Sequence, residues 1–172
     1  MATSKGKIYH RKTPYSDSDI GYETIVEFLI SKGCNVEVKD ENLKQTSLHI
    51  AASSNKPKLI ETLLRTCGSL LDVQDGDGRT PLHIAADMDN ISIVKQLLIA
   101  GARVDTCDKN QDTPLHLAAG KSSSELFQWL ILNKSSLQSR NRDGSLPSMF
   151  IYFFLLYFII FYFIFILFYF YY

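Results

Sequence analysis

The sequence predicts an all-α repeat solenoid, in which similar helical units stack side by side. The first observation is a six-residue motif, Thr80–Ala85, that returns almost unchanged as Thr113–Ala118. A less similar copy occupies Thr46–Ala51, and the three starting threonines lie 34 and then 33 residues apart. A motif that recurs at this period is typical of stacked helical repeats, because each unit buries its apolar face only against its neighbours.

Each unit is expected to begin with a short helix. Thr80 can cap that helix, because its hydroxyl can accept a hydrogen bond from a backbone amide one turn further on. Pro81 suits the first helical position, where no backbone N–H is needed. Ala85 and Ala86 are small, so neighbouring first helices can approach one another closely. The motif therefore predicts a first helix that starts after each threonine.

A second helix is expected after a polar turn. Apolar residues then recur at helical spacing, and a glycine follows that can take the left-handed conformation beyond a helix end. In the central unit these are Ile91, Val94, Leu97 and Leu98, with Gly101 after them. The residues from Asp105 to Asp112 are mostly polar and predict an extended connecting loop. One unit is thus helix–turn–helix–loop.

The period also divides the rest of the chain. Full copies are predicted at about 46–79, 80–112 and 113–145, within a repeat domain that spans 13–149. Residues 13–45 are predicted to be a degenerate repeat, since polar residues replace the first-helix pattern while the second-helix pattern remains. A fifth copy begins at Leu146-Pro147 and is then interrupted. Residues 1–12 are expected to form a disordered leader.

These units resemble the ankyrin repeat, whose signature is Thr-Pro-Leu-His-x-Ala. The resemblance implies paired antiparallel helices with projecting β-hairpin-like loops, and a protein–protein interaction function. Three positions depart from the family pattern. Gln111 replaces the hairpin glycine that Gly78 and Gly144 supply, and Lys134 replaces the helix-ending glycine, where Asn133 could take the left-handed conformation instead. The loop before Thr46 has one extra residue.

The overall composition by itself excludes few classes of function. The chain has 18 Lys and Arg against 18 Asp and Glu, all of them before Met149, so net charge indicates no partner. A basic cluster in the leader, from Lys5 to Lys12, is interpreted as a solvated segment rather than a nucleic-acid or lipid contact. No apolar signal segment is recognisable at the start. The three cysteines form no CxxC pair and are expected to be free thiols in a reducing compartment.

The motif histidines do not predict a metal centre. His49, His83 and His116 occupy one position in successive units, so they should lie about 10 Å apart, the spacing of packed helices. Zinc requires its ligands within about 2 Å of one ion. The family resemblance implies a structural role for these histidines. We expect no enzyme activity, cofactor, metal or small-molecule substrate.

A calcium site is also not expected. The run Asp75–Gly78 resembles part of a calcium loop but lacks the other ligand positions, including a glutamate at position 12. Aspartate and glycine are ordinary turn residues, and this run falls at a predicted hairpin tip.

The predicted site is therefore a surface for an unidentified protein partner. The resemblance implies contacts through the hairpin tips and the ends of the first helices. Carried over position by position, the hairpin candidates are Glu41, Asn42, Lys44, Gly76, Asp77, Arg79, Lys109, Asn110, Asp112, Arg142 and Asp143. The first-helix candidates are Ser53, Ser54, Asp87, Met88 and Lys121. Few of these residues are expected to carry much binding energy.

Residues 150–172 contain only Phe, Tyr, Ile and Leu, and two interpretations stay open. As a helix, 23 residues would extend about 34 Å, enough for a hydrocarbon core of about 30 Å. That predicts a single C-terminal membrane span with the repeats cytosolic, because Arg140 and Arg142 precede it. Alternatively the segment is translated AT-rich non-coding sequence, since all four residue types have codons without guanine.

Two functional hypotheses follow. The first is an ankyrin-repeat adaptor or scaffold, tethered to a membrane if the terminal segment is genuine and cytoplasmic otherwise. The second is the N-terminal fragment of a larger ankyrin-repeat protein whose effector domain is missing. In either case the unit at 113–145 has no intact successor, so part of its apolar flank should be open.

Overall fold

The computed structural model describes residues 20–66, 70–121 and 123–148, with side chains described from residue 24 onward. This part of the chain folds entirely into helices and loops. Its helices are α1 (Ile20–Ser31), α2 (Ser47–Ser53), α3 (Pro57–Thr66), α4 (Pro81–Asp87), α5 (Ile91–Ile99), α6 (Pro114–Ala119) and α7 (Ser124–Leu132). The described residues contain no β-strand, in agreement with the predicted all-α repeat fold.

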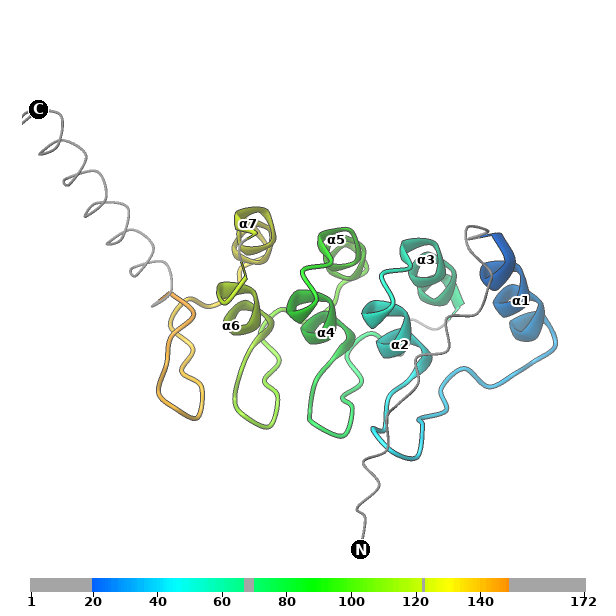
Figure 1. Ribbon diagram of the computed structural model, residues 1–172, viewed down its shortest axis with the longest axis horizontal. Helices are drawn as coiled ribbons and strands as arrows, with labels where there is room; N and C mark the ends of the chain where they lie inside the picture. The colour runs from blue at the N-terminus through cyan, green and yellow to red at the C-terminus, as the bar shows by residue number, and fades with distance from the viewer. Residues whose placement is uncertain (1–19, 67–69, 122, 149–172) are drawn as a thin grey trace, which may run out of the picture.

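The helices form two parallel rows (Figure 1). We call α2, α4 and α6 the inner row and α1, α3, α5 and α7 the outer row. Long loops leave the helices on the inner-row side, and all of them project in the same direction. Neighbouring inner helices pack on one another, and each inner helix also packs on the outer helix that follows it in the chain. The loops and the inner row together form a surface that we call the loop-side face.

The inner helices begin where the threonine motif predicts. Thr80 is extended, with φ of −87° and ψ of 165°, and its hydroxyl accepts a 3.4 Å hydrogen bond from the amide of His83. Pro81 occupies the first turn. Ala52, Ala85 and Ala86 are completely buried, which is consistent with close packing between neighbouring inner helices.

The core runs continuously between the two rows. Its largest members are fully buried aliphatic side chains from every described helix except α1. They include Leu48, Ile60, Leu63, Leu82, Ile93, Leu97, Leu115, Leu126 and Leu130. Complete burial of one such side chain stabilises a fold by roughly 1.5–3 kcal/mol.

Helix α1 differs from the other outer helices. Its Ile25 and Leu29 are 57% and 44% exposed, whereas Ile93 and Leu97, at the same repeat register in α5, are 0% exposed. Among the described helices α1 packs chiefly against α3. The predicted start of this degenerate repeat, residues 13–19, and the predicted leader, 1–12, lie outside the described residues.

The positions without glycine keep the left-handed backbone. Gln111 has φ of +63°, close to the +78° and +75° of Gly78 and Gly144 at the same register. At the end of α7, Asn133 could have taken this conformation in place of the missing glycine, but it does not. Lys134 takes it itself, with φ of +66°, while Asn133 has φ of −87°. The repeat geometry thus overrides the side-chain preference, which costs roughly 1 kcal/mol for a residue other than glycine.

The predicted membrane location requires correction. Within residues 20–66, 70–121 and 123–148, no helix has the length and apolar character needed to cross a bilayer. This finding contradicts the predicted membrane location, and neither the C-terminal hydrophobic helix nor membrane association is supported. Residues 150–172, on which that prediction rested, lie outside the described part of the chain.

Candidate protein-binding face

An Asp or Asn side chain closes each hairpin on the loop-side face. Asp75 Oδ1 accepts hydrogen bonds from the amides of Asp77 and Arg79, both at 2.9 Å. Asp108 and Asn141 make the corresponding bonds in the next two hairpins. Backbone hydrogen bonds also hold Asp40, in the first hairpin, and they lower the pKa of its carboxyl. The hairpins are therefore fixed internally before any partner binds.

Neighbouring hairpins are also joined to one another by a backbone ladder. One amide near each tip donates to a carbonyl of the preceding hairpin. The pairs are Gly76 N to Leu43 O at 2.6 Å, Lys109 N to Asp77 O at 3.0 Å, and Arg142 N to Asn110 O at 2.8 Å. A Cβ at Gly76 would lie 2.9 Å from the Leu43 oxygen, so a larger residue at this position would force a local shift of the two hairpins. The ladder makes four loops into one continuous edge.

The motif histidines link each inner helix to the following hairpin. His83 Nε2 lies 3.1 Å from the carbonyl oxygen of Asp112, and His49 and His116 make the same contact with Arg79 and Ser145 at 3.0 and 3.2 Å. A carbonyl only accepts, so Nε2 carries the proton. The unprotonated Nδ1 of His83 then accepts from the Thr80 amide at 3.1 Å. This bonding pattern requires a neutral ring.

Burial favours the same protonation state. Loss of solvent lowers the pKa of both His49 and His83 below the usual value of 6.5, and it outweighs the opposing effect of the hydrogen bond to the next carbonyl. In residues 20–66, 70–121 and 123–148, no group of three or more His, Cys, Asp or Glu side chains could hold a metal ion. The histidines thus serve the stacking of repeats.

Charged side chains cross the middle of the loop-side face. Asp87, at the end of α4, lies between Lys121, 3.0 Å from Nζ, and Arg79, 3.6 Å from Nη1. Arg79 Nε is 3.9 Å from a carboxylate oxygen of Asp108 and is buried without a hydrogen-bond partner among the described residues. These four residues come from three successive repeats and form one chain of alternating charge.

Two exposed apolar side chains accompany this chain of charge. Met88, beside Asp87, is 55% exposed, and Ile50 on α2 is 50% exposed. Isolated exposed apolar residues are common on soluble proteins. Here, however, Ile50 lies on α2 and Met88 directly follows α4, so both accompany the inner row. The face therefore combines rigid polar loops with apolar points of contact.

The other predicted site residues are distributed along the same face. Ser53 and Ser54 are exposed, but their hydroxyls donate to the Ile50 carbonyl at 2.9 and 2.7 Å. Asp112 is half-buried and accepts a 2.8 Å bond from Asn141. The exposed hairpin residues are Glu41, Asn42, Lys44, Asp77, Lys109, Asn110, Arg142 and Asp143. Gly76 contributes backbone only.

Sequence reasoning did not select Ile50, Asp108 or Asn141 for this face. Ile50 belongs to the apolar pattern of the inner helix, and Ile84 at the same register is only 6% exposed. Periodicity alone therefore does not predict which of the two side chains is exposed. For Asp108 and Asn141, the sequence itself could have predicted a place in the hairpins. Both stand at the hairpin position that Asp75 occupies, where an Asp or Asn side chain typically caps a turn.

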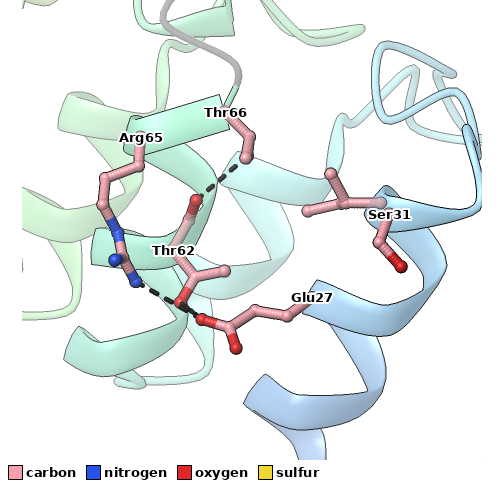
Figure 2. Close-up of a pocket in the computed structure, with 6 residues that line it drawn as sticks. Glu27, Ser31, Thr62, Arg65 and Thr66 are labelled. Atoms are coloured by element: carbon pink, nitrogen blue, oxygen red, sulfur yellow. Dashed lines mark hydrogen bonds and ion pairs between the residues drawn. The ribbon is translucent and has the colours of Figure 1, made fainter.

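A depression on the outer row is a weaker candidate. It lies between α1 and α3 and includes Glu27, Thr62 and Arg65 (Figure 2). Glu27 from α1 accepts hydrogen bonds from Arg65, at 3.3 Å, and from Thr62, at 3.5 Å, both on α3. These polar groups join the two helices and are engaged with one another. The geometry indicates a helix-packing contact.

The described cysteines show no catalytic environment. Cys34 and Cys107 are free thiols, and Cys67 lies outside the described residues. Burial, followed by the nearby carboxylates of Asp105 and Asp108, raises the pKa of the Cys107 thiol. A raised pKa reduces the thiolate fraction, which is the nucleophilic form. Cys107 is therefore a poor candidate for a reactive residue.

The geometry defines a class of protein, namely a helical repeat solenoid with a ladder of hairpins along one edge. A family model for ankyrin repeats in three copies matches residues 18–108 and 89–150. The chain belongs to the ankyrin repeat family, as its motif predicted. Ankyrin repeats are protein–protein interaction modules, which agrees with the coarse function expected from the sequence.

Individual relatives match only part of this chain. Similar proteins include the NF-kappa-B p105 subunit of Gallus gallus, 30% identical over 82 residues, which are 46% of this chain and 8% of that protein. Rabankyrin-5 of Mus musculus is 34% identical over 96 residues, 48% of this chain and 8% of that protein. NF-kappa-B inhibitor alpha of Gallus gallus is 43% identical over 56 residues, 33% of this chain and 17% of that protein. The chain thus spans less than a fifth of each relative.

Proposed function

We propose that this chain is an adaptor that binds a polypeptide segment of another protein across its loop-side face. The proposal rests on two features that occur together at the centre of that face. An exposed Met88 lies beside a chain of charges that spans three repeats, while the backbone ladder fixes the adjoining loops. A surface organised before binding loses little conformational entropy on association.

The face favours a partner with one apolar side chain flanked by charged groups. An apolar side chain can cover Met88, whose flexible thioether adapts to different shapes. Asp87, Lys121 and Arg79 then offer both signs of charge around that contact. The wider set of hairpin residues, from Glu41 to Asp143, would supply complementarity with little energy each. We infer no catalytic step at this face.

The relatives support a protein as the class of partner. The name NF-kappa-B inhibitor alpha describes a protein that acts on another protein, and it shares 43% identity with this chain over 56 residues. Identity over so short a stretch does not carry over the particular partner. The proposal therefore extends to a protein ligand in general, with the loop-side face as its binding surface.

Affinity capture with the full chain tests the proposal. We compare the unmodified chain with Met88→Glu and with a matched control, Ile99→Glu, which places the same charge at a 79% exposed position on the outer row. Substitution at a central contact is expected to lower affinity for the captured proteins by more than about tenfold. Ile99→Glu should retain them. Equal retention by all three chains, or equal loss in both variants, would contradict the proposed surface.

A second candidate role is the binding part of a longer ankyrin-repeat polypeptide with a separate effector domain. The observation that favours it is the limited coverage of the relatives, 8% for both the p105 subunit and Rabankyrin-5. Sequencing of transcripts across the codons of Met149 and Phe150 tests it. Messages that continue the repeat after Ser148 and then encode another domain are expected. Their absence among abundant messages would argue against this role.

A further inference from the structure

A series of side-chain contacts runs along the hairpins, parallel to the backbone ladder. In each repeat the residue before the motif threonine reaches the Asp or Asn that closes the next hairpin. The three pairs are Gln45 with Asp75, Arg79 with Asp108, and Asp112 with Asn141. The first and last pairs are hydrogen-bonded, at 3.5 and 2.8 Å. In the central pair Nε of Arg79 is 3.9 Å from Oδ2 of Asp108, which is too far for a hydrogen bond.

The guanidinium of Arg79 donates no hydrogen bond to any described residue. Its Nη1 is 3.6 Å from Oδ2 of Asp87, again an ion pair without a hydrogen bond, and its Nε is buried without a partner. A guanidinium has five N–H donors in a planar fork that matches a carboxylate. The side chain is 34% exposed, so part of the fork can be reached from solvent. Arg79 therefore has unused donors on the loop-side face.

The two carboxylates beside this guanidinium already have other partners. Asp108 is 1% exposed in its side chain, and its Oδ1 accepts hydrogen bonds from the amides of Asn110 and Asp112 at 2.8 and 2.9 Å. Oδ1 of Asp87 is 3.0 Å from Nζ of Lys121. The carboxylates thus flank the guanidinium and attract it, but they leave its donors unsatisfied.

The backbone of Arg79 is fixed in addition. Its amide donates to Oδ1 of Asp75 at 2.9 Å, and its carbonyl accepts from the Asp75 amide at 2.9 Å and from Nε2 of His49 at 3.0 Å. A donor that is held in place before binding loses little conformational entropy when it meets its acceptor. Arg79 is therefore a well-placed anchor for an acceptor group.

We propose that Arg79 binds a carboxylate of the partner, next to the apolar side chain that covers Met88. This inference rests on the proposed function and names the chemistry of the partner segment, an acidic residue close to an apolar one. Asp87 joins the two contacts, because it precedes Met88 in the chain and lies beside Arg79. A carboxylate can accept two parallel hydrogen bonds from a guanidinium, which adds geometric specificity to affinity. The ion pair of Lys121 with Asp87 reduces the repulsion between Asp87 and the incoming carboxylate.

Peptide selection on the full chain tests the proposal. The probe is a displayed library of random twelve-residue peptides, and the selecting chains are the unmodified chain, Arg79→Gln and a matched control, Arg65→Gln. Glutamine already precedes the motif threonine in the preceding repeat, as Gln45, so this register accommodates it. Arg65 lies on the outer row, is 65% exposed and is ion-paired with Glu27 at 3.3 Å. Circular dichroism verifies that the three chains fold alike.

Peptides selected on the unmodified chain and on Arg65→Gln should carry Asp or Glu at a fixed distance from an apolar residue. A synthetic copy should lose at least about tenfold in affinity when its acid is replaced by the amide, because hydrogen bonds to charged groups are strong. It should lose a similar factor on Arg79→Gln, and the two changes together should cost no more than either alone.

Two results would overturn the inference while leaving the proposed function intact. They are selected peptides that need Met88 but show no preference for an acid, and an acid preference that persists on Arg79→Gln. Selection of no peptide, or of peptides whose binding Met88→Glu does not weaken, would overturn the proposed surface and this inference together.

Discussion

Helices α1 and α5 carry the same apolar pattern but have different surroundings. Ile25 and Leu29 of α1 correspond in register to Ile93 and Leu97 of α5, yet the first pair is about half exposed and the second is fully buried. Helix α5 packs on α4 and lies between α3 and α7, whereas α1 packs chiefly on α3. An amphipathic pattern thus defines a helix, while its neighbours in the array decide how much that helix contributes to stability.

The largest expected difference comes from truncating the two equivalent leucines. Leu97→Ala removes a fully buried side chain and should lower the free energy of unfolding by about 3 kcal/mol. Leu29→Ala removes one that is 44% exposed and should cost less than about 1.5 kcal/mol. Urea denaturation followed by circular dichroism measures both. Equal losses would break the comparison, because α1 would then be as well packed as α5.

The hairpin ladder should supply the next largest effect. Gly78 has φ of +78°, and a Cβ there would lie 3.0 Å from the Lys109 amide nitrogen in the neighbouring hairpin. Gly101 has φ of +95° but open space around it, so it is a matched control. We expect Gly78→Ala to cost about 2 kcal/mol and Gly101→Ala about 1 kcal/mol, measured by urea denaturation. Equal costs would show that contact between hairpins adds little.

Acid should weaken the contacts between stacked repeats. His49 and His83 have pKa values lowered by burial, so the unfolded chain binds more protons than the folded chain below pH 6.5. Their contribution is complete above the unfolded pKa and declines as the pH falls from 6.5 towards the lowered values. We therefore expect the free energy of unfolding to decrease between pH 7.5 and 5.5, as measured by urea denaturation at each pH.

Two variants identify the source of that pH dependence. His83→Gln should be less stable at pH 7.5, because its buried hydrogen bonds are lost, but it should lose less stability on acidification. His49→Gln should show the same two changes, because His49 makes the corresponding hydrogen bond and burial also lowers its pKa. A pH dependence that stays the same in His83→Gln would assign it to other groups.

The smallest expected effect is a gain in stability. Lys134 is held at φ of +66°, where Gly33 and Gly101 stand at the ends of α1 and α5. Lys134→Gly relieves that conformation and should raise stability by up to about 1 kcal/mol, after the extra chain entropy of glycine is subtracted. Thermal unfolding reports the change. The control Lys109→Gly, at a position without positive φ, should not stabilise; a similar gain there would remove the backbone explanation.

Much of the fold was predictable because the motif is local and periodic. Threonine, proline and alanine at fixed offsets predict where each inner helix begins, and the apolar pattern predicts each outer helix. Burial was less predictable, since it depends on the neighbouring repeats. Ile25 and Ile93 have the same residue type and register, and only the structure shows that the first is exposed and the second is buried. The conformation of Lys134 likewise depends on the geometry of the whole turn.

The binding surface was predictable as a face but not as a set of contacts. Transfer of the family pattern placed Met88, Asp87 and Lys121 on the loop-side face. It did not predict that Asp87 would lie between Lys121 and Arg79, or that Asp108 would be buried behind Arg79, because side chains from three repeats meet there. The predicted membrane span relied on length and hydropathy alone, and the described helices give it no support.

The central claim is that position in the array, rather than local pattern, determines the stability of each helix. Hydrogen exchange of the full chain, resolved by mass spectrometry, tests it most directly. The account predicts that amides of α1 exchange at least about tenfold faster than those of α5, because the more exposed apolar side chains of α1 oppose local opening less. Equal protection across 20–31 and 91–99 would contradict it.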